Sequence, residues 1–231
     1  MELRAEYMVI SPVLGEIKWE SVPDDFLLAI QLGWLDFLEK EWKEHFFEAR
    51  QGFTALSISW KSAQSQASFQ KQFQKIKIKP KNLSSQIWEI PVCYDPDYGY
   101  DLGAVALAHR ITVNELINLH SSVTYRLHFF GFLPGFPYLN GLPERLHTPR
   151  KSVPDRTVDA GSVAIGGRQT GIYTQESPGG WHVIGRSPIV LFDVNKNPPV
   201  FASPGDRLKF EPINIYEMEK MLISPPFPRK R

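Results

Sequence analysis

The sequence predicts an α+β protein of two domains, and three observations support this. The chain has 231 residues, of which 42% are hydrophobic and 22% charged, enough to bury a sizeable core. Strand and helix patterns alternate over about the first eighty residues, whereas short strands and turns fill residues 131–212. Because residues 77–85 make the best linker, we expect an N-terminal α/β domain at residues 1–85 and a second domain at residues 86–231.

The first domain is expected to open with a strand over residues 7–13. A Ser-Val-Pro-Asp segment supplies a helix cap, and the apolar-periodic stretch after it predicts a long helix over residues 26–49. Residues 53–60 alternate apolar with small polar side chains, as a half-buried strand does. Residues 62–75 are rich in Gln and Lys with a thin apolar seam, which predicts a second, more exposed helix. This order is typical of a small α/β sandwich.

The second domain is expected to begin with a strand over residues 88–94 and two short helices over 101–108 and 113–119. Thr112 and Glu115 have the spacing of a capping box at the start of the second helix.

A further strand is expected at residues 125–130, and beyond it only short strands and turns. A Pro-Gly-Asp turn predicts a final strand around residues 208–210. The proline-rich tail 223–231 is expected to be frayed.

Charge and cysteine content narrow the class of protein. A formal net charge of +1 gives no reason to expect nucleic acid or an acidic membrane as a partner. The first residues lack the features of a signal peptide, and no run approaches the roughly twenty apolar residues of a membrane span, so a cytoplasmic location is expected. Cys93 is the one cysteine, which excludes an internal disulfide, and its apolar neighbours predict a buried structural thiol.

Patterns for self-contained chemistry are absent from the sequence. It has no G-x-S-x-G elbow and no G-x-x-x-x-G-K-[ST] phosphate loop, so no independent nucleotide site is expected and no catalytic nucleophile is identified. The six histidines follow no metal-binding pattern, so no metal site is expected. His120 and His182 lie at the edges of predicted loops and are candidates for a site, although His120 fits a helix-capping role equally well.

The most informative stretch lies between Gly131 and Pro188. The whole sequence has 16 glycines and 19 prolines, and 17 of these residues lie in this stretch. They are interleaved with large aromatic residues. Glycine lets the backbone approach a ligand, proline fixes loops and rings supply walls, so the stretch predicts an ordered binding surface. The alternative is a tightly turned β-barrel whose loops happen to be apolar.

Cations are frequent in the same stretch, namely Arg145, Arg150, Lys151, Arg156, Arg168 and Arg186. A planar guanidinium binds a carboxylate or phosphate at two points, and glycine-loop amides add neutral donors. Arg150 follows a proline and Arg186 follows a glycine, and we predict these two to be functional. Lys151 and Arg168 are expected to be surface charges paired with nearby carboxylates.

A closer resemblance is carried by a series of short segments. They are Gly131-Phe-Leu-Pro-Gly135-Phe-Pro-Tyr138, Thr148-Pro-Arg150, Ala160-Gly-Ser162-Val-Ala-Ile, Gln169-Thr-Gly-Ile-Tyr173, and Ser177-Pro-Gly-Gly-Trp181 with Ile184-Gly-Arg186. In this order and spacing the chain resembles the family of the 5-oxoprolinase B subunit. That family is also described as allophanate hydrolase subunit 1 or KipI-like, and is similar to subdomains C and D of the carboxyltransferase region of urea amidolyases. The resemblance covers residues 90–212 well and the first eighty or so weakly.

The resemblance implies a ferredoxin-like N-terminal α/β domain and a C-terminal cyclophilin-like β-barrel. It also implies a non-autonomous enzyme component that acts with a homologous C subunit and with an A subunit in the ATP-dependent opening of 5-oxoproline to L-glutamate. ATP is expected at the level of that complex. The residues carried over as substrate-binding are His120, Arg150, Gln169, Tyr173, Trp181 and Arg186. The loop or interface residues are Gly131, Phe132, Pro134, Gly135, Phe136, Tyr138, Pro178, Gly179 and Gly180.

Two carboxylates depart from the pattern of that family. Where a second Pro-Arg and a Val-Pro-Ala-Gly-Ser are usual, this chain has Pro154-Asp155, and Asp159 before its Ala-Gly-Ser. Arg156 could replace the missing positive charge from the next position. Adjacent residues of an extended chain point to opposite faces, however, so Arg156 would not lie where the usual arginine does. Carboxylates added near an anion site weaken the binding of an anion. Two interpretations therefore stay open: the chain keeps the usual substrate of the family, or this stretch belongs to an interface with a partner.

Other functions also follow from the resemblance. A KipI-like member of the family inhibits the autophosphorylation of a sporulation histidine kinase, so a regulatory binding protein is the alternative to an enzyme component. A role related to allophanate or urea ranks lower, because the sequence contains no biotin-carrying or carboxylase domain. A proline isomerase ranks last, since a shared fold does not decide function.

Overall fold

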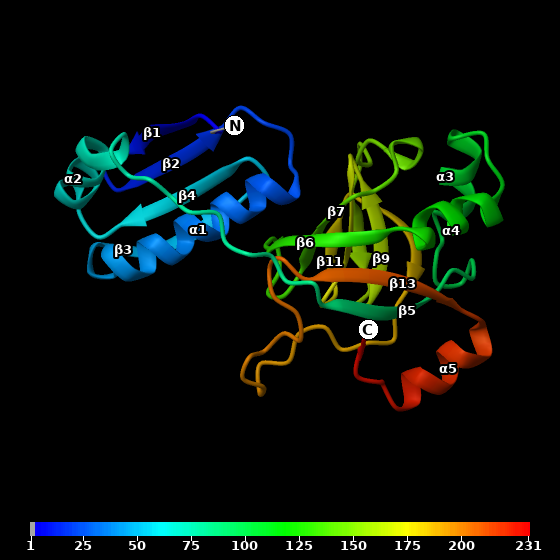
Figure 1. Ribbon diagram of the computed structural model, residues 1–231. Helices are drawn as coiled ribbons and strands as arrows, with labels where there is room; N and C mark the ends of the chain where they lie inside the picture. Colours follow the sequence, from blue (N-terminus) through cyan, green and yellow to red (C-terminus); the bar gives the residue numbers. More distant parts are fainter. Residues whose placement is uncertain (1–2) are drawn as a thin grey trace. The chain divides into compact units, whose positions relative to one another are not determined.

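The chain divides into two compact units, residues 1–83 and 84–231, in a computed structural model that describes residues 3–231. Each unit has a sheet and a hydrophobic core of its own (Figure 1). The division after Leu83 lies two residues ahead of the boundary expected from the linker. No helix within the described residues combines the length and the apolar character of a membrane span.

The N-terminal unit is a four-stranded antiparallel sheet with two α-helices. Its elements are β1 (Ala5–Ser11), β2 (Leu14–Trp19), α1 (Asp25–Glu41), a 3-10 turn (Lys43–His45), β3 (Phe46–Gln51), β4 (Ala55–Trp60) and α2 (Ala63–Phe73). The strand order is β1-β2-β4-β3, so β2, α1 and β3 form a split β-α-β unit with β4 between its strands. This is the predicted ferredoxin-like arrangement with one difference. The strand beside β2 at the edge of the sheet is β1, which comes first in the chain, whereas the usual fold places its last strand there.

Helix α1 begins as predicted and ends earlier. The Asp24 side chain accepts a hydrogen bond of 2.7 Å from a backbone N–H of the first turn and so caps the helix. The helix ends at Glu41, and the prediction that it continues to residue 49 is wrong. Trp42 leaves the helical conformation with a φ of −129°, and Phe46 starts β3 opposite Trp60. The run of aromatic residues therefore continues from helix into strand, which a single apolar pattern does not distinguish.

Strand β2 is an element that the sequence patterns miss. Ile17 and Trp19 are buried and the intervening Lys18 is exposed, but this alternation spans only six residues. Both side chains join a core that also includes Leu27, Leu38, Leu56, Ile58, Trp60 and Phe69. The core is dense in aromatic residues, which explains the aromatic character of α1 as packing.

The C-terminal unit is a closed seven-stranded β-barrel with three helices, as the cyclophilin-like prediction requires. Its elements are β5 (Ile87–Cys93), α3 (Leu102–Ala108), α4 (Val113–Ser122), β6 (Thr124–Phe130), β7 (Pro137–Asn140), a 3-10 turn (Glu144–Leu146), β8 (Asp155–Val158), β9 (Ser162–Gly166), β10 (Gln169–Ile172), β11 (Ser177–Gly179), β12 (His182–Arg186), β13 (Arg207–Ile213), α5 (Ile215–Ile223) and β14 (Arg229–Lys230). The order around the barrel is β12-β9-β10-β7-β6-β13-β5, and β12 pairs with β5 to close it. A separate two-stranded ribbon joins β8 and β11.

The barrel interior is filled by aliphatic and aromatic side chains from most of its strands. Ile90, Leu127, Leu139 and Phe210 are fully buried. Cys93 is 1% exposed, and burial raises the pKa of its thiol, which confirms the prediction of a buried structural cysteine.

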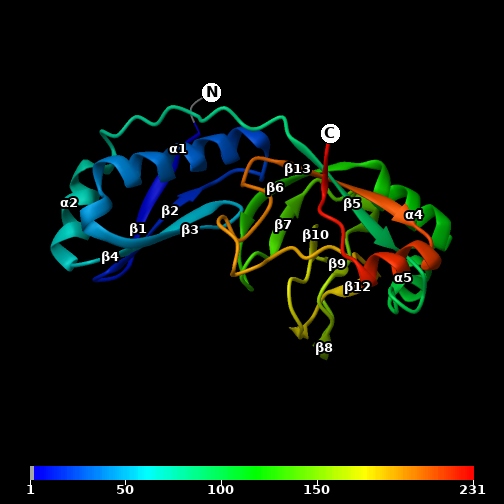
Figure 2. The ribbon, with the colours of Figure 1, turned by 90° about the horizontal axis from the view of Figure 1, so that it is seen from below.

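The C-terminal segment is ordered, and the prediction of a frayed tail is wrong. Helix α5 extends to Ile223, and β14 then pairs antiparallel with β5, with Arg229 opposite Glu89. Figure 2 shows α5 and the red C-terminal segment on the side of the barrel where β5 runs. The Lys230 ammonium lies 4.8 Å from the centre of the Trp88 ring, so an aromatic face holds a stretch that is proline-rich and basic in sequence.

Candidate functional site

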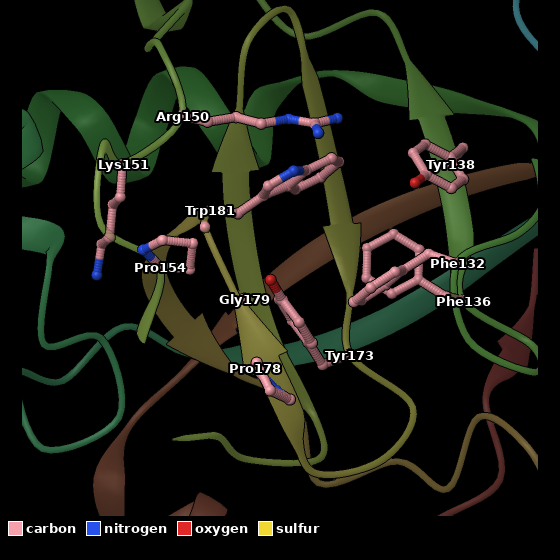
Figure 3. A pocket seen from close by; sticks show the side chains of 11 residues that line it. Phe132, Phe136, Tyr138, Arg150, Lys151, Pro154, Tyr173, Pro178, Gly179 and Trp181 are labelled. Atoms are coloured by element: carbon pink, nitrogen blue, oxygen red, sulfur yellow. The ribbon is translucent and has the colours of Figure 1, made fainter. Parts of the chain in front are cut away.

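A pocket of about 330 Å³ lies in the turn-rich stretch of the C-terminal unit. It is lined by Phe132, Phe136, Tyr138, Arg150, Lys151, Pro154, Tyr173, Pro178, Gly179, Gly180 and Trp181. Figure 3 shows phenylalanine side chains on one side of the pocket and Lys151 with Pro154 on the opposite side. The stretch that the sequence singles out therefore encloses a concave surface whose side chains are mostly aromatic.

The loop between β6 and β7 builds one wall from two consecutive turns. The Leu133 backbone N–H donates to the Gly131 carbonyl at 2.8 Å, which closes a three-residue turn around Phe132. The Phe136 N–H donates to the Leu133 carbonyl at 3.0 Å and closes a four-residue turn. That second turn has proline at its second position and Gly135, with a φ of +73°, at its third, as a type II turn requires.

Aromatic rings form the inner surface of the pocket. The Phe136 ring meets Tyr173 edge-on at 5.3 Å and Trp181 edge-on at 5.6 Å between ring centres. Gly166 is needed beneath Trp181, because a Cβ atom there would lie 2.5 Å from the indole. Burial raises the pKa of the Tyr173 hydroxyl, partly offset by a hydrogen bond from the Trp181 backbone N–H, so this hydroxyl stays protonated at neutral pH.

Arg150 supplies the pocket with a positive charge. Its guanidinium carbon lies 5.7 Å from the centre of the Trp181 ring, in cation–π contact. Among residues 3–231, no carboxylate lies within ion-pair distance of it. Burial raises the pKa of Tyr138, and the charge of Arg150 opposes that rise. The positive charge of Arg150 therefore acts on a side chain that lines the pocket, and it is available to pair with an anion.

Lys151 is, in contrast, neutralised by two carboxylates. Its ammonium lies 2.7 Å from an oxygen of Asp101 and 2.6 Å from an oxygen of Asp155, and its side chain is only 15% exposed. Burial lowers the pKa of Lys151, but hydrogen bonds and charge from the two carboxylates outweigh it and leave the pKa above its usual value. The Tyr100 hydroxyl also donates to Asp155, at 3.2 Å. The prediction of a carboxylate partner for Lys151 is confirmed, but the side chain lies in the pocket wall.

Arg186 is held by the chain and does not line the pocket. Its Nε donates to the Ala160 carbonyl at 2.9 Å, and its terminal nitrogen lies 3.2 Å from an oxygen of Asp159. The two carboxylates that depart from the family pattern, Asp155 and Asp159, are therefore both paired with cations. Neither adds an uncompensated negative charge to the pocket.

His120 lies inside the barrel and not at the pocket. The Tyr94 hydroxyl lies 2.7 Å from His120 Nδ1, and the Thr170 hydroxyl lies 3.0 Å from Nε2. Because Thr170 also donates to the Ala164 carbonyl, Nε2 carries the proton and Nδ1 accepts from the tyrosine. The ring stacks on Phe210 at 4.7 Å, and complete burial lowers the pKa of His120 to about 3. The helix places His120 at its end, as expected, but the side chain turns inward.

The pocket brings together part of the predicted set. Of the predicted substrate-binding residues, Arg150, Tyr173 and Trp181 line it, and His120, Gln169 and Arg186 do not. Of the predicted loop residues, those that line it are Phe132, Phe136, Tyr138, Pro178, Gly179 and Gly180. Gly131, Pro134 and Gly135 shape the β6–β7 loop instead. Gln169 opens β10 opposite Gly166. His182 Nε2 donates a hydrogen bond to the Pro149 carbonyl, 3.0 Å away, and so holds the residue before Arg150.

The sequence patterns miss the group that supports Lys151. Asp101 ends the loop before α3, about fifty residues from Lys151, and its carboxylate also accepts from the Val183 backbone N–H at 2.7 Å. No local signal connects these positions, because the barrel brings them together. Pro154 lines the pocket as well, and its only signal is its place beside Asp155.

The fold and the site define a two-unit α+β protein with a cyclophilin-like barrel and an aromatic, cation-bearing pocket. The chain belongs to the family described as carboxyltransferase domain, subdomain C and D, which matches residues 25–202. It is 48% identical over 128 residues to the B subunit of 5-oxoprolinase from Escherichia coli O157:H7, which is 55% of this chain and 59% of that protein. It is 51% identical over 122 residues to the B subunit of 5-oxoprolinase from Haemophilus influenzae, or 53% and 57% of the two chains. The matches thus span somewhat over half the length of these curated relatives.

Solved structures show the same architecture. A conserved uncharacterized protein from Pyrococcus horikoshii is 33% identical and has a TM-score of 0.57 over 92% of this chain and 100% of that one. The urea amidolyase of Kluyveromyces lactis has a TM-score of 0.82 over 99% of this chain and 16% of that one. At 17% identity this second likeness concerns the fold alone, and it confirms the α+β class.

Proposed function

We propose that this chain is a non-autonomous component of an ATP-dependent 5-oxoprolinase, and that its pocket binds the carboxylate and ring of 5-oxoproline. The naming of relatives at 48% and 51% identity as the B subunit of 5-oxoprolinase supports this function. The partners proposed with it are a homologous C subunit and an A subunit. The observation that carries the proposal is Arg150, a cation without a carboxylate partner among residues 3–231 that is stacked on Trp181 beside an aromatic cavity.

The pocket has the groups that binding of a small cyclic carboxylate requires. The guanidinium of Arg150 pairs with the carboxylate, and a charge-assisted pair of this kind is strong and directional. The apolar ring edge packs against Phe136 and Trp181. Tyr173 lines the pocket and keeps its proton at neutral pH, and we assign it the donation of a hydrogen bond to the lactam carbonyl. Such a donor stabilises negative charge that develops on that oxygen during ring opening.

The same lining supports a role that depends on partners. None of the eleven residues that line the pocket is a serine, threonine, cysteine, histidine, aspartate or glutamate. The one lining amine, Lys151, is protonated and paired with two carboxylates. The pocket therefore binds and orients, while the nucleophile and base of the proposed reaction come from a partner protein.

The lining residues do not fit a nucleoside triphosphate. A triphosphate carries several negative charges, and in the pocket Arg150 is the only lining cation without a carboxylate partner among the residues that the structure describes. ATP is therefore proposed for the complex as a whole and not for this pocket.

Reconstitution tests this function directly. ATP-dependent hydrolysis of 5-oxoproline is measured with the purified chain alone and again with the matching A and C subunits. We expect turnover only in the complete mixture. Turnover by the chain alone would contradict the non-autonomous role. An assembled complex without turnover would contradict the enzyme function altogether and would favour a regulator of a histidine kinase, the alternative that the sequence leaves open.

A further inference from the structure

Phe132 is an exposed aromatic residue held in an unfavourable backbone conformation at the pocket. Its side chain lines the pocket and remains 61% exposed. Its φ is +67°, in the left-handed region that bulky side chains rarely adopt. Only two residues other than glycine have a positive φ in the described part of the chain, and the other, Arg110, follows the end of a helix.

The positive φ belongs to a three-residue turn of the rarer kind. The hydrogen bond from the Leu133 N–H to the Gly131 carbonyl spans Phe132 alone, and with a positive φ this is the strained form of the γ-turn. Glycine adopts this conformation at little steric cost, whereas a residue with a Cβ atom does not. A phenylalanine here therefore destabilises the loop relative to glycine, and most of its ring is exposed to solvent.

The surrounding contacts prevent the loop from relaxing. The Thr174 hydroxyl donates to the Pro134 carbonyl at 2.8 Å, and the neighbouring Gly135 packs closely against Phe192 and Val200. The Phe132 ring stands perpendicular to Phe136 at 5.6 Å and to Tyr173 at 6.2 Å between centres. The fold thus fixes both the strained turn and the direction of the ring, a combination that is concentrated at ligand sites.

We propose that Phe132 is a specificity-determining residue of this pocket, whose ring covers the bound ligand and selects cyclic carboxylates over open-chain ones. The inference rests on the proposed function, because it assumes that the carboxylate of the ligand sits at Arg150. Bound in this way, a compact ring presents an apolar edge that the Phe132 ring covers, removing apolar surface of both from water. An open-chain carboxylate has the same polar groups but must lose bond rotations to present the same edge.

A matched pair of ligands isolates the effect of the ring. N-acetylalanine carries the same amide and carboxylate as 5-oxoproline and lacks one ring bond. In the reconstituted complex, the KM for 5-oxoproline is compared with the inhibition constant of N-acetylalanine. We expect wild type to favour the cyclic compound by at least about tenfold.

Three variants complete the test. Phe132→Gly should raise the KM for 5-oxoproline about tenfold and change the inhibition constant of N-acetylalanine by less than about threefold, since mainly the cyclic ligand loses a packed face. Phe132→Leu, which keeps apolar bulk without the ring, should lie in between. The control is Phe227→Gly, because Phe227 is 63% exposed and does not line this pocket. It should leave both constants unchanged.

Thermal unfolding of the isolated variants separates this role from ordinary packing. Phe132→Gly should unfold at the same temperature as wild type or a few degrees higher, because it removes the strain of the turn. Phe227→Gly should unfold at a lower temperature, because it adds flexibility where no positive φ requires it.

The outcomes are distinguishable from those of the proposed function. Absence of turnover by the complete wild-type complex removes the proposed function and this inference with it. Normal turnover, with Phe132→Gly selecting the cyclic ligand as strongly as wild type, overturns the role of Phe132 and leaves the proposed function intact. Destabilisation by Phe132→Gly as large as that by Phe227→Gly also overturns it, since Phe132 would then be a packing residue.

Discussion

The Arg150 guanidinium and the Trp181 indole lie 5.7 Å apart, from the guanidinium carbon to the ring centre. The indole is 5% exposed and rests on Gly166, so it is a fixed platform for the cation above it. This contact keeps the charge of Arg150 at the pocket, where the neighbouring Lys151 is already paired with carboxylates. Arg150 is therefore available to an anion, whereas Lys151 is neutralised.

Removal of Arg150 should affect binding far more than stability. Arg150→Ala is expected to raise the KM for 5-oxoproline in the complete complex about 10- to 100-fold, because a hydrogen bond to a charged group contributes about 1.5–3 kcal/mol. The free energy of unfolding should change by less than about 0.5 kcal/mol, because the side chain is on the surface. Arg150→Lys keeps the charge without the planar fork and should lie in between. An unchanged KM in a correctly assembled Arg150→Ala complex would remove this residue from the site.

Arg186→Ala should leave the KM for 5-oxoproline within about twofold of wild type, contrary to the role that the sequence predicts for Arg186. The structure directs its guanidinium to Ala160 and Asp159, outside the pocket. The pair with Asp159 is partly exposed, so its loss should cost no more than about 1 kcal/mol of unfolding free energy. Steady-state kinetics and urea unfolding check both values. A KM raised as far as in Arg150→Ala would place Arg186 at the ligand.

Stability of the barrel should fall in mild acid because of His120. Burial lowers the pKa of His120 from 6.5 to about 3, so as the pH falls the unfolded chain binds the proton first. The contribution of His120 to the free energy of unfolding is complete above about pH 6.5. Below that pH it decreases by about 1.4 kcal/mol per pH unit, until His120 is also protonated in the folded state. Urea unfolding at several pH values between 7 and 4 should show a shallower pH dependence in His120→Gln, which has no titrating ring. Equal slopes in the two proteins would mean that His120 is not buried in the neutral form.

Substitution by alanine should destabilise the protein at Gly166, beneath Trp181, and leave its stability unchanged at Gly180 in the pocket lining. In Gly166→Ala the new Cβ atom would lie 2.5 Å from the Trp181 indole, so we expect a loss of about 1–3 kcal/mol in unfolding free energy and a raised KM. Gly180→Ala is the control, because the nearest heavy atom to its new Cβ would be 3.8 Å away and its φ is not positive. It should stay within about 0.5 kcal/mol of wild type. Intrinsic tryptophan fluorescence reports whether the indole has moved, and equal spectra for both variants would contradict the close approach.

Much of the fold follows from the sequence because its long periodic elements are strongly patterned. The strand at β5 and the helices α3 and α4 lie where apolar spacing and the Thr112 cap place them. The end of α1 does not, because Phe46 and Phe47 continue the aromatic run of the helix into β3, which pairs with β4. Strand β2 is missed because its stability comes from neighbours on both sides, β1 and β4, and not from its own six residues.

The site is predictable in its composition and less so in its geometry. Glycine and proline density identifies the stretch that encloses the pocket, and Trp181 and Arg150 are found within it. His120 does not line the pocket, and its position at a helix end does not reveal whether the side chain faces solvent or the barrel interior. Arg186 does not line the pocket either, because a residue on a barrel strand points to one of two faces, and sequence distance from Trp181 does not decide which.

A single carboxylate links two walls of the pocket. Asp101 accepts from the Val183 backbone on β12 and from the Lys151 ammonium, at 2.7 Å each, and so joins two walls before any ligand is present. The side chain of Lys151, the residue after Arg150, is therefore held in place by the fold itself. For the ligand that we propose, association then immobilises little more than the ligand and the arginine side chain, which favours tight binding by a small molecule that makes few contacts.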